Sequence, residues 1–333
     1  TPWTRPGALV SSGPFVLKEW KPHQHILVGQ SPTYWDRATV RLTAIRFYPI
    51  DSMNAEERAY RAGQLHGTWA LPLSKILPFQ QEKSPALRID PILETFFFRL
   101  NVRRTPLDDT RIRQALSLAL DRDAIAGKIL PGGRQPAPTF VSPLLKGYTP
   151  PGRRAYDLAA ARQLLTDAGH PGGAGLPPIE ILYNNSEILR LVAEAIQQMW
   201  QRDLGLDIRL VNQEFKVVFA NRRAGDYQIL LGSWTADYLD ATTFLDMWRS
   251  DSGNNHTGWS DLAYDALSNR ANTIADPAAR AAVLAQAEAL VLDAAPIIPV
   301  YFNTHAYLLH PAVKGWQPTP MDHTDYRYVW LEK

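Results

Sequence analysis

Three aspartates that follow a predicted buried strand are the residues of this chain best placed for chemistry. The strand covers Tyr227–Leu231, and the segment GSWTADYLDA, residues 232–241, comes directly after it. Asp237 and Asp240 lie in that segment, and Asp246 follows it. Carboxylates in such a group could act as a general acid and base, bind a metal, cap a helix or pair with a cation.

Asp237 is the acid whose surroundings favour a cationic ligand. It comes just after the carboxyl end of a strand, where ligands usually bind in α/β folds, and Trp234 and Tyr238 flank it. Aromatic neighbours exclude water, which strengthens a charge pairing, and their faces add cation–π attraction. The alternative is a structural aspartate that holds a turn by accepting hydrogen bonds from backbone amides.

The other two acids have simpler interpretations. Asp240 is predicted to cap a helix that begins near Ala241, and Asp246 is predicted to lie solvated within that helix. A hydrolase that uses Asp237 with a second acid stays open as an alternative, although no carboxylate spacing singles out a partner.

The motifs of several enzyme classes are missing from the sequence. It contains no phosphate loop, no G-x-G-x-x-G, no H-E-x-x-H and no G-x-S-x-G. The absence of cysteine excludes disulfides and thiolate metal sites. His305, His310 and His323 are grouped late in the chain, but their spacing does not favour a zinc site. We therefore predict no catalytic residue, no cofactor and no metal ion.

The elements that must hold these residues alternate between strand and helix from residue 96 onward. The apolar periodicity predicts strands over 96–102, 179–183, 206–211, 227–231, 297–302 and 305–309, and helices over 108–120, 157–168, 186–203, 216–223, 261–274 and 277–293. Such alternation is typical of an α/β domain. The preceding part is richer in β-structure, with a hairpin over 15–29, a strand over 42–48 and a helix over 55–65.

Length and composition predict two lobes. A chain of 333 residues, 45% apolar and 20% charged, is longer than one core usually accommodates. Ala306–Leu309 and Tyr328–Leu331 are predicted edge strands that return to the first lobe, so we expect lobes over 1–93 with 305–333 and over 94–304. A net charge of +2 without a basic tract argues against a nucleic-acid partner. No apolar run is long enough for a membrane-spanning helix.

Four motifs give the chain a resemblance to a known family. Ser12–Trp20 (SGPFVLKEW) and Ser31–Trp35 (SPTYW) resemble the central motif of the family 5 extracellular solute-binding proteins, the peptide receptors of bacterial ABC importers. Asp109–Arg122 (DTRIRQALSLALDR) matches a second motif of that family. Leu210–Phe215 (LVNQEF) and Gly232–Tyr238 (GSWTADY) are similar to its oligopeptide-binding subgroup. The resemblance extends from about residue 3 to the C-terminus.

The resemblance implies a fold and a function. The fold is an α/β periplasmic-binding-protein type II-like fold, with two lobes of mixed sheets closing over a ligand. The function is capture of oligopeptides without chemistry, in the periplasm or outside the cell, with an ABC permease in the inner membrane as partner. At the position of Asp237 the family binds the peptide's α-ammonium group. Ser233, Trp234 and Thr235 would pair with the peptide backbone, and Trp234 and Tyr238 would wall the cleft.

Departures from the family pattern qualify this picture. Family members carry a longer N-terminal portion, so the resemblance implies a truncated first lobe whose exposed edge could self-associate. Leu189 and Leu231 stand where oligopeptide receptors place basic residues for peptide C-termini, whereas Arg222 retains one. Arg99 replaces an acidic family residue, and it is either a further carboxylate partner or surface charge. Dipeptides, cell-wall peptides, nickel chelates and sugars stay open as alternative ligands.

Overall fold

Aromatic and branched residues build the central strands of a six-stranded sheet with the order β5-β9-β4-β8-β6-β7. Its strands are β4 (Leu87–Leu100), β5 (Gln135–Pro136), β6 (Ile179–Asn184), β7 (Ile208–Gln213), β8 (Ile229–Thr235) and β9 (Ile297–Leu308). The strand β8 pairs antiparallel with β4 and parallel with β6, so the sheet is mixed. This computed structural model describes residues 5–152 and 156–332.

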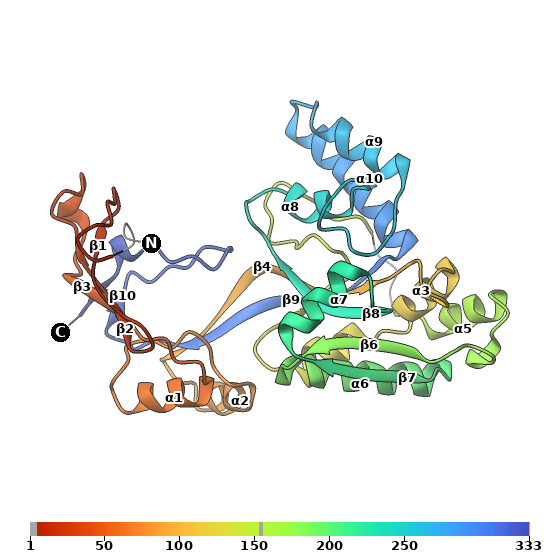
Figure 1. The fold of residues 1–333 in the computed structure, drawn as a ribbon, viewed down its shortest axis with the longest axis horizontal. Helices are drawn as coiled ribbons and strands as arrows, with labels where there is room; N and C mark the ends of the chain where they lie inside the picture. The colour runs from red at the N-terminus through yellow and green to blue at the C-terminus, as the bar shows by residue number, and fades with distance from the viewer. Residues whose placement is uncertain (1–4, 153–155, 333) are drawn as a thin grey trace. The chain divides into compact units, whose positions relative to one another are not determined.

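Helices cover the sheet, and aspartates or serines at their N-caps start most of them. They are α3 (Thr110–Leu118), α4 (Arg122–Ala124), α5 (Leu158–Asp167), α6 (Glu187–Leu204), α7 (Phe215–Ala224), α8 (Thr242–Leu245), α9 (Leu262–Ala271) and α10 (Pro277–Ala294). Asp109, Asp157 and Asp276 each accept a backbone N–H at the start of a helix. In Figure 1, α6 runs alongside β6 and β7, and α9 packs beside α10.

The two faces of β4 carry different aromatic clusters because alternate side chains point to opposite sides of a strand. Phe97 packs edge-on against Phe140 and Trp248, with ring centroids 4.8 and 5.7 Å apart. Phe98, one residue later, packs against Trp200 of α6. The first cluster also packs against the segment that follows β8, since Phe140 contacts Phe244 in α8.

The chain divides into two compact units. Unit 1 comprises Thr1–Asp90 with His305–Lys333, and unit 2 comprises Pro91–Thr304. The predicted division placed the first junction at residue 93 rather than 90. Unit 1 contains β1 (Phe15–Lys21), β2 (His25–Gln30), β3 (Ala44–Phe47), α1 (Met53–Arg61), α2 (Leu73–Gln81), β10 (Val313–Lys314) and β11 (Trp330–Leu331). The strands β1, β2 and β3 form an antiparallel sheet in that order.

Two parts of the predicted secondary structure are wrong. The strands expected over 297–302 and 305–309 are one continuous strand, β9, because the polar residues Asn303 and Thr304 stay in the ladder and bond Glu94 and the Gly132 carbonyl. The helix α2 was not predicted, since Pro72 and Pro78 interrupt its pattern; Pro72 is its N-cap. Within the described residues, no helix is both long and apolar enough to cross a membrane.

Candidate functional site

The last residues of β8 change from buried to alternately exposed. Ile229, Leu230 and Leu231 are buried, whereas Ser233 and Thr235 are exposed and Trp234 is half-buried. Side chains that alternate along a strand face opposite sides, so Ser233 and Thr235 share the open side. The predicted strand ended at Leu231, but the structure carries it to Thr235 and places GSWT inside it.

One edge of this exposed segment has no neighbouring strand. On the β4 side the ladder runs through to Thr235, which pairs with Glu94. On the β6 side the register covers Ile229 and Leu230, opposite Ile181 and Leu182. In the part of the chain that the structure describes, no strand continues this pairing along residues 231–235. Backbone groups at such an edge can take up an added strand.

Asp237 stands at the end of this edge with a free carboxylate. Its side chain is exposed, and no hydrogen bond or ion pair to it is found within residues 5–152 and 156–332. The turn is held instead by Thr243, whose hydroxyl accepts the Asp237 N–H at 3.0 Å and whose carbonyl accepts Trp234 Nε1 at 2.8 Å. The alternative in which the Asp237 carboxylate holds the turn is therefore wrong.

The aromatic neighbours of Asp237 are fixed to the same loop. The Trp234 ring is tied by its hydrogen bond to Thr243, and the hydroxyl of Tyr238 lies 3.3 Å from that of Thr242. Tyr238 keeps 46% of its surface exposed, so its ring is available to a ligand. The structure thus brings Ser233, Trp234, Thr235, Asp237 and Tyr238 together on one strand end.

Asp240 is not the predicted N-cap, because α8 has Ala241 at that position, without a side-chain cap hydrogen bond. The Asp240 carboxylate accepts the Thr242 N–H at 3.0 Å and binds both Nη atoms of Arg280 at 2.6 and 2.9 Å. The Arg280 guanidinium is the main reason that the pKa of Asp240 falls to about 2. Because Arg280 belongs to α10, this bidentate pair anchors the loop after Asp237 to that helix.

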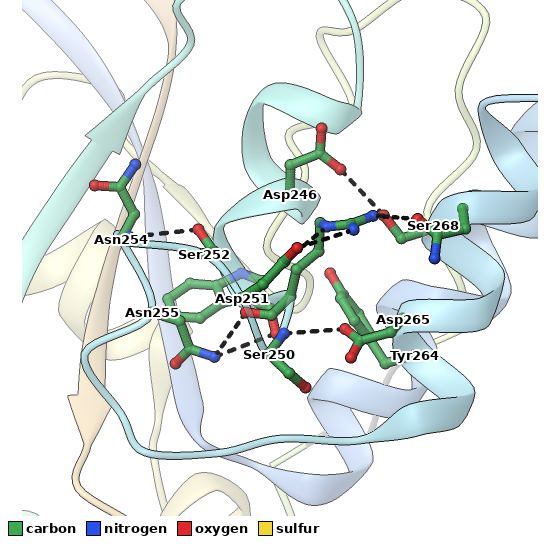
Figure 2. Close-up of polar contacts among 12 residues, drawn as sticks. Asp246, Ser250, Asp251, Ser252, Asn254, Asn255, Tyr264, Asp265 and Ser268 are labelled. Atoms are coloured by element: carbon green, nitrogen blue, oxygen red, sulfur yellow. Dashed lines mark hydrogen bonds and ion pairs between the residues drawn. The ribbon is translucent and has the colours of Figure 1, made fainter.

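Asp246 is not the solvated helix residue that was predicted. It lies half-buried in η5 (Asp246–Trp248), where it accepts a hydrogen bond from the Ser268 hydroxyl at 3.2 Å. Figure 2 shows this contact within a network of Asp, Ser and Asn side chains, in which the carboxylate of Asp265 accepts the Ser250 N–H at 3.0 Å. Arg249 also enters this network through Asp251 and Ser268. Among the described residues no group of three His, Asp or Glu side chains could hold a metal ion.

Arg99 and Arg222 lie together in unit 2, away from Asp237 along the sheet. Arg99 in β4 pairs with Leu230 and is 3% exposed, so the interpretation as surface charge is wrong. Burial is the first cause, and the nearby Arg222 the second, that lower the pKa of Arg99 to about 10. The Nε atoms of both arginines are buried without a hydrogen-bond partner in the described chain. Burial also lowers the pKa of Arg222.

Sequence reasoning missed the residues that support the site. Thr243 and Arg280 hold the Asp237 loop, and Glu288 holds the loop beneath it by accepting the N–H groups of Phe140 and Val141, both at 2.7 Å. Glu288 is fully buried. The one sequence signal for this role of Glu288 was an acidic residue on the apolar side of a predicted helix. A buried acid in such a position is usually hydrogen-bonded to other buried groups.

The chain is similar in sequence to bacterial solute-binding proteins. A family model described as "Bacterial extracellular solute-binding proteins, family 5 Middle" matches residues 1–256. The periplasmic oligopeptide-binding protein OppA of Escherichia coli K12 is 30% identical over 347 residues, which cover 99% of this chain and 62% of that protein. The probable deoxycholate-binding periplasmic protein YgiS of the same organism is 33% identical over 340 residues, covering 99% of this chain and 62% of that protein.

Solved structures show the same similarity. Haemophilus influenzae OppA in complex with RPPGFSPFR matches with a TM-score of 0.84 and 29% identity, over 99% of this chain and 66% of that one. The predicted α/β periplasmic-binding-protein fold with mixed sheets is thereby confirmed. The chain spans about three fifths of the length of the curated relatives it matches.

Proposed function

Because the chain belongs to family 5 of the bacterial extracellular solute-binding proteins, as its match over residues 1–256 shows, we propose that it binds peptides for an ABC importer. Relatives named for oligopeptide, dipeptide and murein-peptide binding support this proposal. The importer's permease in the inner membrane is the proposed partner, and the periplasm or the cell exterior is the proposed location. The net charge of +2, without a basic tract, gives no positively charged surface segment that would attract a nucleic acid.

The observation that carries the proposal is the free carboxylate of Asp237 at the end of an unpaired strand edge. An extended peptide can hydrogen-bond along residues 233–235, because the edge of β8 on the β6 side has no partner there. A peptide whose backbone adds to that edge can place its α-ammonium group beside Asp237. Both contacts use features that all peptides share, so they are independent of the peptide's sequence.

The remaining site residues receive the rest of the ligand. Trp234 and Tyr238 offer ring surfaces next to the ammonium position, where cation–π attraction adds to the charge pairing. Arg222 and Arg99 are assigned to carboxylate groups of the ligand, because their buried Nε atoms have no hydrogen-bond partner in the described chain. Ser233 and Thr235 contribute mainly their backbone groups.

Catalysis is not part of the proposed function. A hydrolase would require a second carboxylate that can give a proton at neutral pH. Asp240 is the nearest acid in sequence, but Arg280 holds its pKa at about 2, so it stays ionised.

A carboxylate ligand without an ammonium group is the second candidate. The 33% identity to a protein named as a probable deoxycholate-binding protein favours it, and so do the unpaired arginines. Such a ligand would occupy Arg99 and Arg222 and leave Asp237 unused.

Native mass spectrometry of the 333-residue chain separates the two candidates. The chain is mixed with deoxycholate and an equimolar set of short peptides with free termini. We expect adducts with peptide masses to predominate. Adducts of deoxycholate alone, or no adduct at micromolar concentrations, would count against peptide binding.

Self-association through unit 1 stays a prediction. Trp35 is 84% exposed and Trp69 71% exposed in that unit, and exposed apolar surface of this kind favours contacts between copies. Sedimentation velocity at increasing concentration tests it, and a constant monomer sedimentation coefficient would rule it out.

A further inference from the structure

The Arg99–Arg222 cluster of unit 2 carries positive charge that no residue of the described chain neutralises. Arg223 adds a third guanidinium, which lies over the Phe219 ring at 4.6 Å, while Arg222 lies over the same ring at 4.1 Å. Arg99 lies over the Phe97 ring at 4.5 Å. These ring contacts attract the cations but accept no in-plane hydrogen bonds from the guanidinium N–H groups.

The polar neighbours of the cluster do not supply the missing negative charge. Tyr227 is buried and donates its hydroxyl to the His256 carbonyl at 2.5 Å. Its phenol stays neutral, because burial raises its pKa to about 12. Burial first, and then Arg222 and Arg99, lower the pKa of His256, so that imidazole is neutral at pH 7 as well. Within residues 5–152 and 156–332, no carboxylate is among the charged groups that act on the pKa of Arg99 or Arg222.

A buried cation without a partner is costly to a fold, so a purely structural origin for the pair is poorly supported. Structural arginines of this chain look different. Arg113 is also buried, and its guanidinium donates to the carbonyls of Leu107 and Ala294. Arg99 and Arg222 each have a buried Nε–H group without an acceptor. Free N–H donors of this kind can bind an anion.

The absence of a side chain at Gly232 allows the Arg99 guanidinium to lie directly against β8. A Cβ atom at Gly232 would lie 3.0 Å from Nη1 of Arg99, so a side chain there would crowd the guanidinium. Gly232 lies on β8, five positions before Asp237. β8 ends at Thr235, so at about 3.4 Å per extended residue the backbone interval is at most roughly 17 Å, which a peptide of up to about five residues can span.

We propose that Arg99 and Arg222 form a subsite for two adjacent carboxylates, those of an acidic C-terminal residue of a short peptide. This inference rests on the proposed function, because the distance from Asp237 to the two arginines fixes the peptide length only if the peptide's ammonium group binds at Asp237. Two fixed positive charges without a counter-ion match a C-terminal carboxylate together with the side-chain carboxylate of Asp or Glu. A neutral C-terminal residue would leave one guanidinium unpaired.

The test compares the pentapeptides AAAAE and AAAAQ by isothermal titration calorimetry with the 333-residue chain. We expect AAAAE to bind about tenfold or more tightly, as one added charge-assisted pairing allows. Arg99→Met is expected to bring that ratio close to one. Arg209→Met is the matched control, because Arg209 is exposed on β7, and it is expected to leave the ratio unchanged.

A second measurement keeps the subsite and the peptide function distinguishable. Sulfate is the probe for the subsite alone, and we expect it to raise the melting temperature of the native chain more than that of Arg99→Met. If peptides bind with equal affinity for AAAAE and AAAAQ, the inference is overturned while peptide binding stands. If sulfate acts through Arg99 but no peptide binds, the anion subsite stands and the proposed function fails. Equal sulfate effects on both proteins would also overturn the inference.

Arg99→Met also separates a structural from a ligand-binding arginine without any ligand. We expect the variant to melt at the same or a higher temperature than the native chain, because the substitution removes an unpaired buried charge. A large fall in melting temperature would show that Arg99 supports the fold and would contradict the inference.

Discussion

Replacing Glu288 by glutamine should remove a pH dependence from the stability of unit 2. Glu288 lies on α10, is fully buried, and accepts hydrogen bonds from two backbone N–H groups and from the hydroxyl of Tyr148 at 2.5 Å. The bonds favour the ionised carboxylate, whereas burial disfavours it. Burial is the larger effect and raises the pKa of Glu288 from 4.5 to about 7.

The sign and size of the effect follow from these two values. Below pH 4.5 the carboxyl is protonated in both the folded and the unfolded chain, so its contribution to stability is fully present. As the pH rises through about 7, the unfolded state is already ionised and the folded state must ionise a buried group, so stability is lost. Over pH 5 to 8 the shift corresponds to a loss of about 2.5 kcal/mol.

Urea unfolding of the native chain and of Glu288→Gln at several pH values measures this loss. Groups other than Glu288 titrate in both proteins, so their contributions cancel in the difference between the two free energies of unfolding. We expect the native chain to lose about 2.5 kcal/mol relative to the variant between pH 5 and pH 8. A difference that stays constant with pH, or changes in the opposite direction, would show that the three donors outweigh burial and would refute the reasoning.

Two further predictions concern the loop that carries Asp237. Thr243→Val removes the hydroxyl that accepts the Asp237 N–H, and we expect it to reduce stability by about 1 kcal/mol and to weaken peptide binding severalfold; unchanged calorimetric affinity would show that the turn is held without it. Arg280→Met breaks the bidentate pair with Asp240, whose side chain is about one third exposed. We expect the free energy of unfolding to fall by about 1 kcal/mol, and this loss of stability should be smaller at high salt. A salt-independent loss in urea unfolding would instead indicate that the Arg280 stem stabilises by packing.

The strand end and its acid could be predicted from sequence because the signals are local. A buried run, a glycine, two aromatics and an aspartate lie within a few residues of one another, and the family motif covers the same segment. The register of β8 was not accessible in this way. Its unpaired edge depends on where β6 stops pairing with β8: the pairing ends at Leu182 and Leu230, although β6 itself continues to Asn184, and that is decided by tertiary packing.

The supporting residues could not be predicted because their partners are distant in the chain. Asp240 and Arg280 are 40 positions apart, and Glu288 and Phe140 are 148 apart. In sequence each of these residues is an ordinary charged residue of a helix or loop. The interpretation of Arg99 was open for the same reason: a charged residue in an aromatic strand can face water or the core, and only the β4–β8 pairing places it against Arg222 and Gly232.

The claim that Asp237 binds a peptide's ammonium group is tested most directly by a double-mutant cycle. Calorimetry gives the affinities of the native chain and of Asp237→Asn for one peptide with a free amino terminus and for the same peptide acetylated. We expect acetylation to weaken binding to the native chain by about 10- to 100-fold, as for a charge-assisted hydrogen bond, and to the variant by less than about threefold. Asp123→Asn, an exposed acid of α4, is the matched control and should behave as the native chain does. Equal losses on acetylation in the native chain and in Asp237→Asn would contradict the account.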